Sequence, residues 1–392
     1  MNLAVVPYHD WRKILVEGNR TRDAHFIENF RNSDSVRKLV IINRPITYPE
    51  LIIKKKLKRI TGKILLSKKG FRLIQIDTKT YVIDFISTDF LKHIIHKRDW
   101  YFSAYSNKLY LDFILEAYEH LGINKINYIS FNIYAAYMFD AIKDSSVIFD
   151  AWDNFVKFPF TKSHLHKIKQ AYLAYKNNTI FWTTNAKANL VYYKEHYQLN
   201  KIKIISNGVD IERFNSNECM MPEDLKGLPG PIIGFGGKIT HLFDASLFNY
   251  LLCAHPDKSF VIVGQVLNKA VFQSIKKTNN FYYLGDKSYN LYPQYVKNFD
   301  ICIIPYVLEQ FGHGADTIKA YEFISAHKKT VGTSSSGMGR LSEYIYVCDD
   351  KKVFSECLCN IANEKKRFHD KSFQWQFKAR EILNMFATQT NL

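Results

Sequence analysis

The sequence predicts an α/β protein with two doubly wound domains, each a parallel sheet covered by helices. Short β-branched or aromatic runs recur along the whole chain. The segments between them carry apolar residues at three- and four-residue spacing, which is typical of helices packed on a sheet. The 392 residues are enough for two or three domains. A composition of 47% hydrophobic and 23% charged residues excludes intrinsic disorder.

The predicted strands and helices alternate in both halves of the chain. Candidate strands in the first half cover residues 3–6, 39–43, 128–132, 147–151, 179–184 and 202–206. Candidate strands in the second half cover residues 231–239, 259–264, 281–285, 300–306 and 330–333, with candidate helices at 244–254, 269–277, 291–298 and 316–327. This order favours two Rossmann-like domains, with ligands expected beyond the carboxyl ends of the strands.

The domain boundaries follow from the same pattern. We expect a first domain at residues 1–205 and a polar linker with Pro and Gly at 206–230. A second domain is expected at 231–370, followed at 371–392 by a helix that can cross back to the first domain.

Positive charge is concentrated in the first half. Residues 1–205 contain 33 Lys and Arg against 18 Asp and Glu, a net charge of +15, whereas residues 206–392 carry only +2. Such an asymmetry indicates a polyanionic partner, either nucleic acid or an anionic membrane surface.

A basic block between Lys54 and Arg72 contains nine Lys and Arg, with no acid between Leu51 and Ile76. Apolar residues recur within it at helical spacing, so we expect a basic amphipathic helix that binds a membrane surface. The alternative, a solvated helix face packed on its own domain, stays open. The expected membrane-binding residues are Lys54, Lys55, Lys56, Lys58, Arg59 and Lys63.

Cysteine spacing and hydropathy favour a cytoplasmic protein without metal. The six cysteines all lie in the second half, and no CxxC pair has the spacing of a zinc site. The N-terminus lacks the basic lead of a signal peptide, and no run approaches 18 apolar residues. We therefore expect neither export by this route nor a membrane span.

A glycine-rich turn follows the first strand of the second domain. Gly236, Gly237 and Lys238 lie between that strand and a helix expected after Asp244. Glycines there allow backbone amides to approach an anion at a helix N-terminus. A tight turn without a ligand is the alternative, and the pattern differs from G-x-G-x-x-G because Thr240 stands at the last position.

A second candidate anion site lies further along the chain. Asp316 is expected as an N-cap, which places Lys319 in the first turn of a helix, where a cation opposes the helix dipole. Lys319 and Glu322 are three residues apart and share one helix face, so one ligand can touch both. A surface Lys/Glu pair is the alternative.

These segments resemble a known family. The run from Lys319 to Val331 resembles the K-x-x-E-x-x-A-x-G-x-P-V-V segment of bacterial GT-B glycosyltransferases of family 4, and Asn207-Gly-Val-Asp210 with Phe214 resembles their N-G-V-D-x-x-x-F motif. Asp10 and Trp11, with Arg22 and His25, are similar to the opening of a subset of exopolysaccharide transferases. The resemblance covers most of the second domain and the first more loosely.

The resemblance implies that Lys319 contacts the diphosphate of a nucleotide-sugar donor and Glu322 its ribose hydroxyls, with Gly236, Gly237 and Lys238 near the phosphates. No cofactor is implied, because the nucleotide sugar is the substrate, and a UDP-sugar is favoured over a GDP-sugar. Gly314 stands where the family commonly has a second Glu, so a retaining and an inverting outcome both stay open.

An inverting displacement needs a general base for the acceptor hydroxyl. Asp150 and Asp153 end a predicted strand of the first domain, and Asp153, beyond the strand end, is the better placed. A helix cap is the alternative role for Asp153. His9 and His25 are weaker candidates.

The resemblance therefore implies a GT-B glycosyltransferase that moves a sugar from a nucleotide-diphosphate sugar to a glycan or lipid-linked acceptor in bacterial surface polysaccharide synthesis. We expect it on the inner face of the cell membrane as a peripheral protein. A nucleotide-sugar epimerase of the same fold is an alternative. A nucleic-acid-binding protein is a further one, disfavoured because no RRM, KH, zinc-finger or P-loop signature is present.

Overall fold

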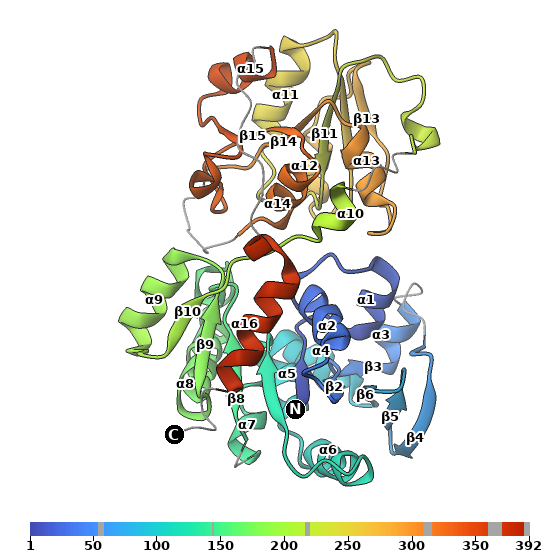
Figure 1. The fold of residues 1–392 in the computed structure, drawn as a ribbon, viewed down its shortest axis with the longest axis vertical. Helices are drawn as coiled ribbons and strands as arrows, with labels where there is room; N and C mark the ends of the chain where they lie inside the picture. Colours follow the sequence, from blue (N-terminus) through green and yellow to red (C-terminus); the bar gives the residue numbers. More distant parts are fainter. Residues whose placement is uncertain (54–58, 143–144, 216–219, 309–315, 360–370, 388–392) are drawn as a thin grey trace. The chain divides into compact units, whose positions relative to one another are not determined.

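The computed structural model describes residues 1–53, 59–142, 145–215, 220–308, 316–359 and 371–387. The chain forms two compact units (Figure 1). Unit 1 contains Met1–Ser206 and the chain from Lys378 onward, and unit 2 contains Asn207–Phe377. Helix α16 (Trp375–Ala387) therefore begins in unit 2 and continues in unit 1.

Unit 1 is built on one large sheet, in the order β10-β9-β8-β7-β1-β2-β6-β5-β4. All neighbours from β10 to β6 are parallel, and β5 and β4 are added antiparallel at one edge. The strands are β1 (Asn2–Val6), β2 (Lys38–Ile42), β4 (Lys63–Lys68), β5 (Phe71–Gln75), β6 (Thr80–Ser87), β7 (Asn127–Ser130), β8 (Val147–Asp150), β9 (Phe181–Thr184) and β10 (Ile202–Ile204), and β3 (Ile46–Thr47) pairs with the end of β6.

The α-helices of unit 1 cover this sheet and bury an aromatic-rich core. They are α1 (Trp11–Glu17), α2 (Arg22–Asn32), α3 (Tyr48–Ile53), α4 (Phe90–His96), α5 (Trp100–Tyr105), α6 (Lys108–His120), α7 (Met138–Ala141), α8 (Lys162–Asn178) and α9 (Lys187–Tyr197). Figure 1 shows α16, in red, beside β10, where Glu381 forms an ion pair with Lys203.

The helix expected over the basic block is wrong from Lys63 onward, because this part forms the hairpin β4–β5. Phe71 and Leu73 are buried on one side of β5 while Arg72 is half-buried, which is the period of a strand and not of a helix. Gly70, with φ +88°, supplies the turn. The expected membrane-binding residues Lys54, Lys55, Lys56 and Lys58 lie outside the described residues.

Unit 2 has a six-stranded parallel sheet in the order β13-β12-β11-β14-β15-β16. The strands are β11 (Ile232–Gly236), β12 (Ser259–Val263), β13 (Phe281–Tyr283), β14 (Ile301–Ile304), β15 (Lys329–Gly332) and β16 (Tyr346–Val347). The α-helices that lie wholly within it are α10 (Ile211–Asn215), α11 (Ala245–Ala254), α12 (Lys269–Gln273), α13 (Tyr292–Asn298), α14 (Ile318–Ser325) and α15 (Lys351–Cys359). The strand order reverses between β11 and β14, so a ligand site is expected at their carboxyl ends.

From Asn207 onward, the segment expected as a linker at 206–230 belongs to unit 2 where the structure describes it. Val209, Phe214 and Leu225 are buried in the second core. Gly208 allows a close approach of the chain before α16, since a Cβ there would lie 2.9 Å from the Phe373 carbonyl oxygen. The described residues that follow the first sheet therefore contribute to the core of the second unit.

No helix in the described part of the chain is both long and apolar enough to cross a bilayer.

Candidate functional site

Lys319 lies at the switch point of the second sheet. It is the second residue of α14, and its ammonium group contacts the two strands between which the order reverses. The Nζ atom lies 5.5 Å from the ring centre of Phe235 on β11 and 5.1 Å from that of Tyr306, just after β14. It also donates a hydrogen bond to the Tyr306 hydroxyl. The aromatic faces partly offset the unfavourable position of a cation near a helix N-terminus.

The glycines at the end of β11 are required by close packing. A Cβ at Gly237 would lie 2.4 Å from Cε of Lys319, and one at Gly236 would lie 2.1 Å from the Tyr292 hydroxyl. The Gly237 amide donates to the Val263 carbonyl, so this N–H is already used inside the unit. A side chain at position 237 would therefore displace Lys319. Lys238, the next residue, is half-buried.

Glu322 is a buried carboxylate on the same helix, with an exposed fraction of 4%. Its Oε1 accepts a hydrogen bond of 2.8 Å from the Tyr289 hydroxyl. Burial, reinforced by the neighbouring Glu322, raises the pKa of Tyr289 well above its usual value, so the phenol stays a donor. Arg213 lies 5.1 Å from the centre of the Tyr289 ring and pairs with Asp210. A chain of contacts thus joins the Asn207–Phe214 motif to Glu322.

Asp316 is not the N-cap of α14, because Thr317 occupies that position. The Asp316 carboxylate accepts instead from the backbone amide of Asn207 at 2.6 Å and pairs with Arg340. The Tyr321 hydroxyl is a third donor, at 3.3 Å. These contacts fix the chain immediately before α14 and so determine where Lys319 and Glu322 project.

The carboxyl edge of the first sheet carries a histidine and aspartate pair. His9 lies just beyond β1, and its Nδ1 is 3.0 Å from both carboxylate oxygens of buried Asp23. Burial alone would raise the pKa of Asp23, but His9 and a hydrogen bond from Thr21 hold it well below its usual value. Among the described residues the Nε2 atom of His9 has no hydrogen-bond partner. The contact with Asp23 at Nδ1 thus fixes the orientation of the His9 ring.

Asp150 and Asp153 have different surroundings. Asp150 is fully buried and forms a two-point ion pair with Arg22, at 2.8 and 3.1 Å. The Thr183 hydroxyl donates to the same carboxylate. Asp153 is half-buried beyond the strand end. Burial raises the pKa of Tyr8, two arginines oppose this rise, and the negative charge of Asp153 adds to it. Asp153 therefore lies near Tyr8, the neighbour of His9.

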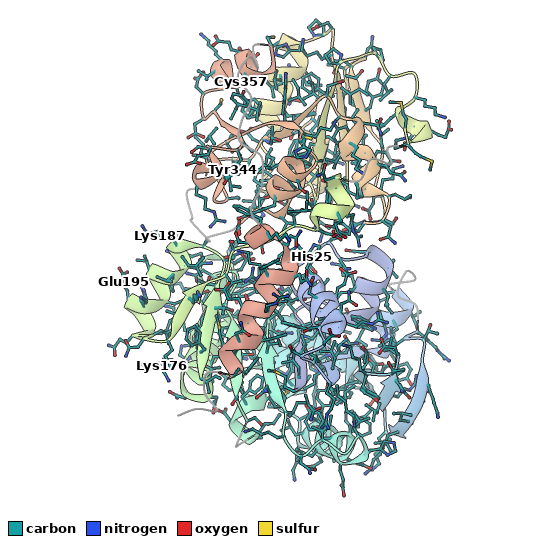
Figure 2. All side chains as sticks on the ribbon, in the orientation of Figure 1. His25, Lys176, Lys187, Glu195, Tyr344 and Cys357 are labelled. Carbon is teal, nitrogen blue, oxygen red and sulfur yellow. The ribbon has the colours of Figure 1, made fainter. Side chains whose placement is uncertain are left out.

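The cap role considered for Asp153 is wrong, because Asn154 caps the 3₁₀ turn that follows and Thr161 caps α8. The remaining predicted residues of unit 1 that the structure describes are His25, Arg59 and Lys63. His25 lies on α2 (Figure 2) and is buried. Arg59 and Lys63 are exposed.

Several residues of these sites had no recognisable sequence signal. Tyr289 and Tyr306 lie in loops, and Arg340 is 24 positions from its partner Asp316. The partnership of His9 with Asp23 links residues on different elements. Of these partners only Asp316 was visible in the sequence, as a polar residue expected at the start of a helix.

Sequence comparison finds one informative relative. No family model matches the chain. The chain is 30% identical over 204 residues to a protein of Bacillus subtilis (strain 168) named "Putative teichuronic acid biosynthesis glycosyltransferase TuaH". The match covers 48% of this chain and 51% of that protein, so the chain spans about half the length of this curated relative.

Structural comparison covers both units. The fold is similar to that of sucrose-phosphate synthase from Thermosynechococcus elongatus, with a TM-score of 0.64, 10% identity and full coverage of both chains. The catalytic domain of starch synthase IV from Arabidopsis thaliana gives a TM-score of 0.61 at 12% identity, covering 100% of this chain and 98% of that one. TarM of S. aureus gives 0.57 at 12% identity, with the same coverage. These similarities confirm the predicted GT-B fold class.

We predict that Asp150→Asn destabilises the protein by about 3 kcal/mol, because it leaves Arg22 charged and buried without its partner. Urea unfolding of the full chain measures the change. Asp112→Asn is the matched control, since Asp112 is exposed and pairs only with Lys108 among the described residues. It should change stability by less than about 1 kcal/mol. Equal stability of the two variants would contradict a structural role for Asp150.

Proposed function

We propose that this protein is a glycosyltransferase that uses a nucleotide-diphosphate sugar as donor. The observation that carries the proposal is the joint position of Lys319 and Glu322 on α14, at the switch point of the second sheet. Ligands of open α/β sheets bind there. The GT-B fold and the partial similarity to a protein named as a glycosyltransferase support the same activity.

In this proposal Lys319 contacts the donor diphosphate and Glu322 accepts hydrogen bonds from the ribose hydroxyls. An ammonium group already held by two aromatic rings is preorganised for a β-phosphate, so little ordering remains to be done on binding. The half-buried Lys238 follows Gly237, where an added Cβ would lie 2.4 Å from Cε of Lys319. In this proposal Lys238 adds a second cation for the phosphates. We favour a UDP-sugar over a GDP-sugar.

The acceptor is proposed to be a glycan or a lipid-linked oligosaccharide at the inner membrane surface. The name of the B. subtilis relative refers to teichuronic acid biosynthesis, which places that relative in surface polysaccharide synthesis. The net charge of +15 on residues 1–205 is suited to an anionic leaflet. Arg59 and Lys63 are exposed cations that fit this surface.

The transfer step makes one bond and breaks another. The acceptor oxygen bonds to the anomeric carbon, the nucleoside diphosphate leaves with the bonding electron pair, and the acceptor proton passes to a base. We propose that the carboxyl edge of the first sheet supplies this base, with Asp153 the candidate from its position and His9 the alternative from its geometry. An Asp that orients His9 through Nδ1 leaves Nε2 for the proton.

Three experiments separate this function from the alternatives. Nucleotide binding is tested by thermal stabilisation with UDP, GDP, CMP and dTDP, since a ligand at one hundred times its dissociation constant stabilises by about 2.7 kcal/mol. Product analysis with a nucleotide sugar and no acceptor tests for the epimerase. A nucleic-acid-binding protein would instead show a steep salt dependence of RNA or DNA affinity.

We predict that Lys319→Ala weakens binding of a nucleoside diphosphate more than that of the monophosphate, because only the diphosphate carries the group that Lys319 contacts. The loss of a charge-assisted bond corresponds to about ten- to a hundredfold in affinity. Glu322→Gln should weaken both ligands alike, since both carry the ribose. Calorimetric titration measures these affinities.

The control for this pair is Lys269→Ala, an exposed lysine at the start of α12 in the same unit. It should leave both affinities unchanged. Equal weakening of mono- and diphosphate binding by Lys319→Ala, in a folded protein, would show that its assigned role is wrong.

We predict that replacing the general base lowers the transfer rate by about 10²- to 10⁴-fold while donor affinity survives. Asp153→Asn and His9→Gln are assayed separately for sugar transfer and for nucleotide binding. The variant that loses only transfer identifies the base. Near-normal turnover of both variants would favour a retaining mechanism without a base from the protein.

A further inference from the structure

Helix α4 presents an apolar face to solvent. Of its seven residues none is buried, and the exposed fractions are 42% for Phe90, 62% for Leu91, 65% for Ile94 and 71% for Ile95. Phe90 and Ile94, like Leu91 and Ile95, are four residues apart, and residues at this spacing lie above one another on a helix. The four side chains therefore form a continuous surface.

Such a surface is unusual on a globular unit. A surface helix ordinarily turns its apolar residues toward the core, as α6 does with Phe113 and Ile114. Single exposed apolar side chains are common, whereas a contiguous group marks an interaction site. Helix α4 is attached on its other side, where the His93 ring packs against Trp100 at 4.9 Å. The apolar face is thus held in place by the rest of unit 1.

Helix α3 carries further exposed apolar residues and begins at the same edge of the sheet. Ile52 and Ile53 at its end are 72% and 79% exposed. Strands β3 and β6 run parallel, with Thr47 opposite Ser87, so their ends lie about 5 Å apart. Helix α3 starts directly after Thr47, and α4 starts three residues after Ser87. Both helices leave the sheet at its carboxyl edge, the edge that also carries Tyr8 and His9.

Cations accompany the apolar face. Lys92 is 67% exposed on α4, and Lys97 and Arg98 follow the helix as exposed residues. Of the two nearest acids, Asp89 pairs with Lys92, and Asp99 is engaged by Lys167 and His164. Apolar residues flanked by cations are the chemistry of helices that lie in the interface of an anionic bilayer.

We propose that the apolar face formed by Phe90, Leu91, Ile94 and Ile95, with Ile52 and Ile53, inserts into the headgroup region of an anionic membrane. This inference rests on the proposed function, because it places a lipid-linked acceptor beside the carboxyl edge of the first sheet. A second copy of the chain is the less favourable occupant, since a symmetric contact would bring Lys97 and Arg98 of both copies together. Arg59 and Lys63, just before and at the start of β4, then add attraction at longer range.

The test uses the full chain and vesicles of phosphatidylcholine with phosphatidylglycerol. We expect the variant Leu91→Ser/Ile94→Ser/Ile95→Ser to bind vesicles at least about tenfold more weakly, because each apolar side chain contributes its burial to the partition. The matched control is Leu109→Ser/Leu115→Ser on α6, where the leucines are 59% and 56% exposed. It should bind like the parent protein. Unchanged binding of the α4 variant would overturn the proposal.

A second measurement reports insertion itself. In Ile94→Trp, the new indole should be quenched by lipids brominated on their acyl chains, and this quenching should persist at high salt. Arg59→Glu/Lys63→Glu should lower vesicle binding only at low salt, since exposed charges are screened. Absence of quenching at position 94 would contradict insertion. A dimer that forms without lipid and is lost in the α4 variant would assign the face to self-association instead.

Nucleotide affinity of the same variants keeps the two proposals apart. The α4 variant should bind nucleoside diphosphate as the parent does, because α4 belongs to unit 1 and α14 to unit 2. Vesicle binding through α4 in a protein that binds none of the four nucleotides would refute the proposed enzyme and leave the membrane contact standing. Nucleotide binding without vesicle binding would refute the membrane contact and leave the proposed enzyme standing.

Discussion

The buried carboxylate of Asp316 is the contact on which the second unit's site depends. It joins three separate parts of the sequence, because its donors are the Asn207 amide, Arg340 and the Tyr321 hydroxyl. Desolvating a carboxylate is costly unless it is fully paired, so this position admits few rearrangements. The chain leaves it directly into α14. The direction of that helix, and with it the spacing of Lys319 and Glu322 from β11 and β14, follows from this one anchor.

The first unit uses buried charge in the same way. Arg22 holds the end of β8 through Asp150 and also donates to the Ile205 carbonyl beyond β10. One residue further along α2, Asp23 holds His9 beyond β1. Adjacent residues in the first turn of one helix therefore fix loops that follow different strands. The Asp150 carboxylate is engaged by Arg22 and by the Thr183 hydroxyl inside the unit, whereas Asp153 is half-buried beyond the strand end.

Much of the fold and part of the site were accessible from the sequence. Apolar runs and helical spacing located the parallel strands, since those signals are local, and Lys319 and Glu322 were adjacent on one predicted helix. We expected a helix over the lysine-rich run before Phe71, because lysine side chains are compatible with both helical and strand periodicity. Only the burial of Phe71 and Leu73 in the folded unit favours a strand there. The Asn207–Asp316 contact spans 109 positions, and no local pattern encodes such a pairing.

Helix α16 has a consequence for how the protein is made. Its residues Ala379, Ile382, Leu383 and Phe386 are buried, and from Lys378 onward the helix belongs to unit 1. On the ribosome, however, all of Asn207–Phe377 is translated between Ser206 and Lys378. At about 5 to 20 residues per second, those 171 residues take roughly 10 to 30 s. During this interval the nascent first unit lacks the apolar face of its last helix, so its maturation waits on the translation of the unit inserted within it.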